Sequence, residues 1–182
     1  MFKKLQFWIL FAFIITSLCG LMYLADQQIL RMGANDPQIQ MSEDIAQNLS
    51  ARADSNPFLA SQAVDIAKSL SPFIIVYKNN KIDAIASNAT LDGKIPQLPE
   101  GVLAATKEKG QSRFTWQPKP GVRIATVITP YSNKQSSGFV LVGRSLREVE
   151  IREDNLLTQV GLAWFAIMVG SLIAVSLFTK RD

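Results

Sequence analysis

Few residues in this chain have the types and spacing that enzyme chemistry requires. The sequence has no histidine, and its one cysteine, Cys19, lies within an apolar segment. A Ser-His-Asp triad, a Cys-His pair, a histidine metal ligand and a phosphate-accepting histidine are therefore excluded. The carboxylates of Glu43-Asp44 and Glu153-Asp154 are sequence neighbours, so on a helix they point apart and face solvent. No glycine-rich phosphate-binding motif is present either, and the sequence predicts no enzyme, no catalytic residue, no metal site and no cofactor.

Two apolar segments are long enough to cross a membrane. Residues 5–25 and residues 155–179 contain no charged side chain. A hydrocarbon core about 30 Å thick needs about 20 apolar residues, so both segments predict a transmembrane helix. A cleaved signal peptide is the alternative for the first segment. Its apolar region would be unusually long, and no small-residue cleavage site precedes Asp26.

The distribution of charge predicts the orientation of these helices. The chain carries 19 Lys/Arg and 15 Asp/Glu, a formal net charge of +4, and residues 26–155 are close to neutral. Most of the excess comes from Lys3-Lys4 and Lys180-Arg181, beside the apolar segments. Positive charge beside a span favours the cytoplasmic side, so we expect a two-pass protein of the cell membrane with both termini cytoplasmic. The same distribution argues against nucleic-acid binding.

We accordingly divide the chain into four parts. A cytoplasmic tip and first transmembrane helix occupy residues 1–25, and an extracytoplasmic domain occupies residues 26–154. The second transmembrane helix spans 155–179, and 180–182 form a cytoplasmic tail. The middle part, about 130 residues, is large enough for a packed core, and it contains no cysteine that could form a disulfide.

The second span is expected to belong to a longer helix that starts inside the middle domain. Ser145 and Glu148 have the spacing of a capping box, in which each side chain bonds the backbone N–H of the other. An apolar stripe follows and no proline interrupts the segment, which predicts one helix over residues 145–179. A separate surface helix joined to a span is the alternative.

Within the middle domain, the patterns predict an α+β fold with an antiparallel sheet. Helix starts are expected at Asp36-Pro37 and at Asn56-Pro57, the second helix running to Leu70. Ala84 and Ala86 leave small side chains on one strand, which either opens space beside the sheet or accommodates a packed helix. Apolar and alternating runs predict five strands and one further helix: strands at 73–78, 82–87, 112–117, 122–130 and 139–143, and a helix at 100–109.

This order of elements resembles that of PAS-like sensor domains, which place two strands, a crossing helix and three antiparallel strands after a long N-terminal helix. More narrowly, it is similar to the extracytoplasmic PDC (single Cache) sensors of bacterial receptors and histidine kinases. The passage FVLVGRSLREVE, residues 139–150, is similar to the end of such sensors. Only a few residues of this sequence follow the second span, so we do not expect the kinase or methyl-accepting coiled coil of those receptors.

The resemblance implies a small-ligand pocket between the sheet and the segment that crosses it. An arginine can hold a carboxylate through two hydrogen bonds, and aromatic rings line pocket walls. The alternative is a sealed core, because arginines that alternate with apolar residues on a strand usually face solvent. The ligand-binding prediction names Tyr77, Arg113, Trp116, Arg123 and Tyr131.

These observations predict a membrane-anchored sensor or binding module that signals to a separate partner through its second membrane helix. The expected partners are membrane lipid, a small-molecule ligand, and either a second copy of the chain or a separate kinase or membrane protein. The alternative is a structural or accessory membrane subunit whose outer domain mediates only protein–protein interaction. A third interpretation is the input half of an interrupted receptor gene.

Overall fold

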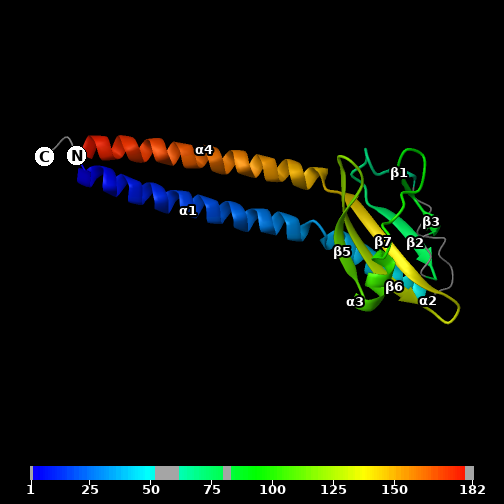
Figure 1. The fold of residues 1–182 in the computed structure, drawn as a ribbon. Coiled ribbons are helices and arrows are strands. Elements are labelled where there is room, and N and C mark those ends of the chain that lie inside the picture. Colours follow the sequence, from blue (N-terminus) through cyan, green and yellow to red (C-terminus); the bar gives the residue numbers. More distant parts are fainter. Residues whose placement is uncertain (1, 52–61, 80–82, 179–182) are drawn as a thin grey trace. The chain divides into compact units, whose positions relative to one another are not determined.

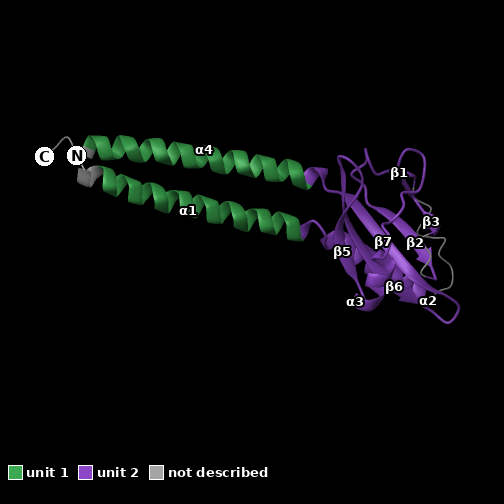
Figure 2. Cartoon of the chain, in the orientation of Figure 1, with its two compact units in different colours: residues 1–32, 149–182 green, residues 33–148 purple. Residues whose placement is uncertain are grey.

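The computed structural model describes residues 2–51, 62–79 and 83–178. The chain divides into two compact units, which Figure 2 shows in different colours. Unit 1 comprises Met1–Met32 and Val149–Asp182, and unit 2 comprises Gly33–Glu148. Each unit is described by itself.

Unit 1 is built from two helices, α1 (Phe2–Gly33) and α4 (Arg147–Phe178), each 32 residues long. Each contains a window of 18 residues that is apolar and in which no residue is buried by the rest of the chain. Phe13 and Leu162, for example, are 70% and 66% exposed. Both helices are therefore long and apolar enough to cross a membrane, as the sequence predicts.

Polar side chains join α1 to α4 at intervals along their length. Trp164 Nε1 donates to Thr16 Oγ1 at 2.9 Å, and Trp8 Nε1 donates to Ser171 Oγ at 3.2 Å. The α4 partner moves towards the C-terminus as the α1 partner moves towards the N-terminus, so the helices pair antiparallel. Half-buried residues recur every three or four positions on each helix and mark the contact: Trp8, Ala12, Ile15 and Cys19 on α1, and Val160, Trp164, Met168 and Ser171 on α4.

A bidentate ion pair joins the same two helices close in sequence to where each meets unit 2, the sheet domain. Arg31 Nε donates to Glu153 Oε1 at 2.7 Å, and Arg31 Nη2 donates to Glu153 Oε2 at 3.3 Å. The hydrogen bond to this carboxylate raises the pKa of the Arg31 guanidinium above its already high value. The ion pair places Arg31 of α1 opposite Glu153 of α4.

Unit 2 has α+β architecture around one five-stranded antiparallel sheet, in which the strand order is β3-β2-β7-β6-β5 (Figure 1). A separate two-stranded parallel ribbon pairs β1 with β4. The strands are β1 (Val64–Asp65), β2 (Phe73–Lys78), β3 (Ala84–Ser87), β4 (Ala89–Thr90), β5 (Ser112–Lys119), β6 (Val122–Ser132) and β7 (Ser137–Ser145), and the helices are α2 (Asp36–Ala51) and α3 (Val102–Lys109).

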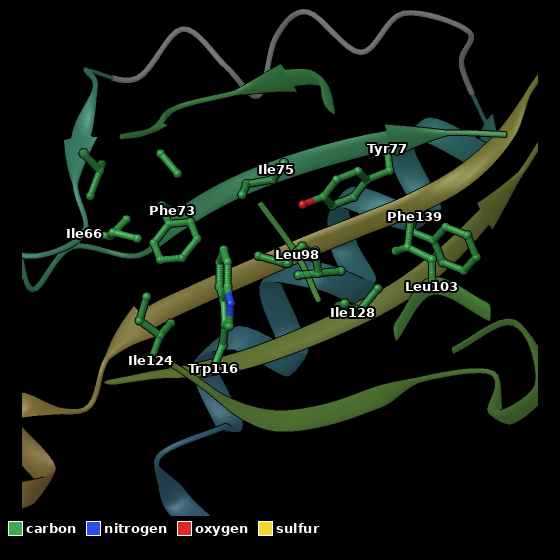
Figure 3. Packing of buried hydrophobic residues seen from close by; sticks show 13 residues of the cluster. Ile66, Phe73, Ile75, Tyr77, Leu98, Leu103, Trp116, Ile124, Ile128 and Phe139 are labelled. Atoms are coloured by element: carbon green, nitrogen blue, oxygen red, sulfur yellow. The ribbon is translucent and has the colours of Figure 1, made fainter. Parts of the chain in front are cut away.

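The two faces of the sheet carry separate cores, because successive residues of a strand point to opposite sides. On one face, Phe73, Ile75 and Tyr77 of β2 pack with Leu98 and Leu103 from the segment that crosses this side. Figure 3 views the sheet from this side, with α2 behind it. On the other face, α2 covers the sheet through three apolar side chains, which pack against four residues of the neighbouring strands: Ile45, Ala46 and Leu49 against Ile74, Val76, Val140 and Val142.

The predicted helix that was to end at Leu70 is wrong over its described part. Residues 64–65 are strand β1 and residues 66–68 a turn, while the start of the predicted helix lies outside the described residues. Val64 and Ile66 are both buried. Their spacing of two fits a strand whose partner, β4, lies between the strand predicted at 82–87 and the helix predicted at 100–109.

The other predicted elements are confirmed, with shifted ends. Helix α2 starts at Asp36 as expected, and α3 occupies most of the predicted 100–109 segment. Strands β6 and β7 extend further towards each other than predicted, because Tyr131 pairs with Gly138 and Ser132 with Ser137. Polar residues therefore continue this hairpin beyond its apolar part.

Strand β7 passes into α4 with only Leu146 between them. The Leu146 N–H donates to the Arg123 carbonyl oxygen of β6 at 2.9 Å. Ser145 Oγ accepts the N–H of Arg147 at 3.3 Å, whereas the predicted capping box has it accept from Glu148. Since Ser145 is still part of the strand, the helix begins two residues later than expected.

Candidate ligand-binding cavity

A small cavity lies beside strand β3, on the face of the sheet opposite α2. Its volume is about 220 Å³. The lining comes from the paired strands β2 and β3 and from the segment after β4: Tyr77, Asp83, Ala84, Ile95, Pro96 and Gln97. The cavity thus lies between the sheet and the segment that crosses it, and all of its described lining belongs to unit 2.

A β-bulge explains why there is space at this point. Val76 pairs with Ala86, but the next residue, Tyr77, pairs with Ala84, so Ile85 has no partner in the register. A bulge of this kind changes which side of the sheet the following residues face. Ala84 therefore lies beside Tyr77 at the cavity, whereas Ala86 packs on the α2 side. Thus Ala84 leaves open space beside the sheet, and Ala86 accommodates a packed helix.

Tyr77 is the cavity residue with the most unusual environment. Its side chain is 1% exposed, and its hydroxyl has no hydrogen-bond partner among the described residues. Desolvation by the surrounding core raises the pKa of this phenol above its usual range. A buried hydroxyl without a partner costs about 1–3 kcal/mol, and a polar atom supplied by a ligand or a water would remove this cost.

The remaining lining combines polar and apolar groups. The Asp83 carboxylate and the Gln97 amide belong to exposed residues, while Pro96 is buried and Ile95 is 46% exposed. Pockets for drug-sized ligands usually have volumes of about 300–1,000 Å³. This cavity is smaller, so it fits a compact polar molecule or one side chain of a protein partner.

Of the five residues predicted to bind a ligand, only Tyr77 lines the cavity. Trp116 is 3% exposed and lies on the same face of the sheet, where it packs in the core with Phe73 and Ile124 (Figure 3). Tyr131 belongs to the core under α2. Its hydroxyl donates to the Tyr77 carbonyl oxygen at 3.4 Å, but its side chain packs on the face opposite the cavity. The ligand role of Trp116 and Tyr131 stays a prediction.

Both predicted arginines lie on the α2 side of the sheet. Arg113 pairs with Val127, whose neighbours on β7 face α2, and its guanidinium donates to Gln111 Oε1 at 2.8 and 2.9 Å. Arg123 has the same strand parity as Val127 on β6 and is exposed. These two arginines therefore cannot bind a carboxylate in the cavity, as they were predicted to do.

A second polar cluster lies between α2 and strand β6. Ser42 and Thr129 share a hydrogen bond of 2.8 Å between their hydroxyl oxygens, and Gln111 Nε2 donates to Thr129 Oγ1 at 3.1 Å and to Glu43 Oε1 at 3.1 Å. Gln38 is 1% exposed, and its Oε1 has no partner among the described residues. These contacts join α2 to the sheet.

Sequence reasoning missed Asp83 and the segment from Ile95 to Gln97. The small side chain of Ala84 is compatible with open space or with a packed helix, and nothing in the sequence places the segment after β4 beside it. That placement depends on the pairing of β4 with β1, two residues on each side, which is too short to give a sequence pattern.

No group of three or more His, Cys, Asp or Glu side chains in the described part of the chain is placed to hold a metal ion. No protein-family model matches the chain, and no curated protein shows a significant similarity to it. Its function is therefore argued from its fold, its cavity and its apolar helices.

Proposed function

We propose that this protein is a two-pass membrane protein whose sheet domain is an extracytoplasmic sensor or binding module. In this proposal, α4 conveys the state of the domain to a separate partner in or behind the membrane. The observation that carries it is the direct passage from β7 into α4. Strand β7 is the middle strand of the sheet, paired with β2 and β6, so any rearrangement of the sheet reaches the strand from which α4 starts.

The proposed orientation rests on the apolar helices and the charges that flank them. Exposed apolar side chains such as Phe13 and Leu162 are stable in lipid and costly in water. The basic pairs Lys3-Lys4 and Lys180-Arg181 favour the cytoplasm for both ends of the chain. Unit 2, which lies between the two helices in sequence, is then outside.

The order of elements supports a PAS-like domain of the PDC (single Cache) type. After α2, the chain forms two strands, then α3, then three strands, all in one antiparallel sheet. This is the order that the resemblance implies, and the β1–β4 ribbon is an addition to it. The cavity beside β3 lies where the resemblance places a ligand.

In this proposal the ligand is a compact molecule that hydrogen-bonds the Tyr77 hydroxyl. The gap left by Ala84 admits it, and Asp83 and Gln97 supply polar contacts. Because the arginines lie elsewhere, the described cavity offers a carboxylate no guanidinium. A donor group such as a hydroxyl or an amine fits the carboxylate of Asp83 better than an acid does.

One observation favours the alternative of an accessory subunit. The volume of about 220 Å³ is below the usual range for ligand pockets, so a side chain from a protein partner fits it as well as a metabolite does. In that case the domain docks a membrane enzyme or transporter and detects no metabolite.

Thermal unfolding of the full-length protein in detergent tests the sensor proposal. A panel of small polyols, amines and carboxylates is added at millimolar concentration, and saturation at about 100 times Kd would add about 2.7 kcal/mol of stability. Ala84→Leu fills the cavity and should abolish the gain, while Ala104→Leu, at an exposed position of α3, should keep it. A panel without any shift would favour the accessory-subunit function.

A further inference from the structure

Two arginines flank the point where β7 passes into α4, and both donate to the same turn. Arg144 Nε donates to the Leu70 carbonyl oxygen at 3.1 Å, and Arg147 Nη2 donates to the Lys68 carbonyl oxygen at 2.9 Å. Residues 65–71 are thereby held against the start of α4. Each bond joins a charged donor to a backbone acceptor, which is stronger than a bond between neutral groups.

The turn that accepts these bonds is ordered by its own hydrogen bonds. Asp65 Oδ1 accepts the N–H of Ala67 at 3.0 Å, and the Asp65 carbonyl oxygen accepts the N–H of Ser69 at 2.8 Å. Ser69 Oγ in turn accepts the N–H of Ser71 at 3.0 Å. A displacement of Asp65 therefore moves the whole turn, including the two carbonyl groups that the arginines hold.

The same turn is connected to the wall of the cavity through the β1–β4 ribbon. The N–H of Val64 donates to the Asn88 carbonyl oxygen at 2.7 Å, and the N–H of Ile66 donates to the Thr90 carbonyl oxygen at 3.0 Å. After β4, a tight turn closed by Leu91 and Lys94 leads directly into cavity residues 95–97. Every step from the cavity wall to α4 is thus a hydrogen bond or a few residues of chain.

We propose that Arg144 and Arg147 are positioning residues that couple the cavity wall to α4. A ligand that displaces residues 95–97 shifts β4, the ribbon carries the shift to the turn, and the arginines pass it to the first turn of α4. This route is additional to the passage of β7 into α4 and reaches the helix from the side. Its role in sensing rests on the proposed function, but the mechanical coupling itself does not.

Hydrogen exchange on the full-length protein in lipid nanodiscs tests the coupling with a double-mutant cycle. Asp65→Ala loosens the turn, and the readout is the exchange of amides 151–156 in α4. In the background with both arginines, we expect this change to accelerate exchange about threefold, as local opening spreads to the helix. In the Arg144→Gln/Arg147→Gln background, Asp65→Ala should have no further effect.

Arg152→Gln is the control for Arg147→Gln, because it also removes one positive charge from α4, at an exposed position whose side chain makes no hydrogen bond among the described residues. In that background the full response to Asp65→Ala should persist. Exchange in β6 reports whether each variant is folded, and Arg147→Gln alone replaces the double variant if folding is lost. Equal responses with and without the arginines would overturn the proposal, as would the absence of a response when both are present. Since the cycle uses neither ligand nor partner, its failure is distinct from a failure of the sensor proposal.

Discussion

At the scale of single residues, the hydroxyl of Tyr77 is the group whose environment fits its chemistry least well. It is buried among apolar side chains and has no partner among the described residues. Replacing this hydroxyl by hydrogen, as in phenylalanine, would relieve its desolvation penalty. The hydroxyl therefore connects the stability of the empty domain with its proposed ligand.

Tyr77→Phe should stabilise the ligand-free protein at pH 7 by about 1 kcal/mol, since it removes the unpaired hydroxyl and keeps the ring. The same variant should lose the stabilisation that a ligand gives to the wild-type protein. Chemical unfolding of both proteins in detergent measures the difference. A loss of more than about 1 kcal/mol on substitution would show that the hydroxyl already has a partner.

The pH dependence of unfolding gives a second test of the same residue. Burial raises the pKa of Tyr77 in the folded state above its unfolded value of about 10. The folded state thus holds this proton more tightly, so its contribution to stability is complete below pH 10 and is lost as the pH rises above that value. One such group gives a slope of at most about 1.4 kcal/mol per pH unit, and Tyr77→Phe should remove that slope.

At the scale of elements, α1 and α4 form an antiparallel pair held by polar side chains on apolar surfaces. The bonds from Trp164 to Thr16 and from Trp8 to Ser171 fix one register. In lipid, such interhelical hydrogen bonds are worth about 0.6–2 kcal/mol each, and they decide which faces meet. In the proposed membrane location, the remaining apolar faces would contact lipid or other helices.

The native cysteine offers a direct test of this register. One turn beyond Thr16, Cys19 lies on the half-buried stripe of α1, and the corresponding position on α4 is Val160. Val160→Cys should form a disulfide with Cys19 on mild oxidation in membranes. Leu162→Cys, which is 66% exposed, should not. Comparable crosslinking of both variants would contradict the described pairing of the helices.

The sequence was sufficient to predict the long elements and insufficient for the short ones. Apolar length defined α1 and α4, and β2 was predicted over its observed bounds, Phe73–Lys78, because it is buried on both faces. The ribbon of β1 and β4 has two residues in each strand, and only the pairing of distant segments creates it. Local patterns therefore gave a helix where the tertiary contact of Val64 and Ile66 imposes a strand.

The candidate site was predicted less well than the fold, for a related reason. Successive residues of a strand face opposite sides of the sheet, and Trp116 pairs with Ile124. Strand alternation alone therefore predicts that Arg113 and Arg123 face the side opposite Trp116. The bulge at Ile85, which brings Ala84 to Tyr77, has no comparable signal in the sequence. The cavity became visible only when the register of β3 against β2 was known.

At the scale of the whole molecule, the proposed orientation, with both termini in the cytoplasm and unit 2 outside, can be tested by labelling. In a Cys19→Ala background, a cysteine at Lys134, in the exposed turn between β6 and β7, should react with a membrane-impermeant maleimide in intact cells. A cysteine in place of Asp182 should react only after the membrane is permeabilised. Reaction of both positions in intact cells would contradict the two-pass orientation with both ends inside.

We also expect α4 to be mechanically continuous from unit 2 into the membrane. Glu153 pairs with Arg31, so it is not interchangeable with its neighbours. Arg152→Ala and Asp154→Ala keep good helix formers at exposed positions and should change little. Prolines at the same two positions remove backbone donors and cost about 3 kcal/mol each in a helix interior.

The distance between the sheet domain and the membrane part of α4 tests the central claim most directly. Nitroxide labels at Thr115, exposed on β5, and at Gln159, exposed on α4, are introduced into the Cys19→Ala protein in nanodiscs. Pulsed electron–electron double resonance should give one narrow distance distribution. Alanines at positions 152 and 154 should leave it unchanged, and prolines at the same positions should broaden it. A broad distribution in the protein without these changes would show that the junction is a flexible tether and would contradict signalling through α4.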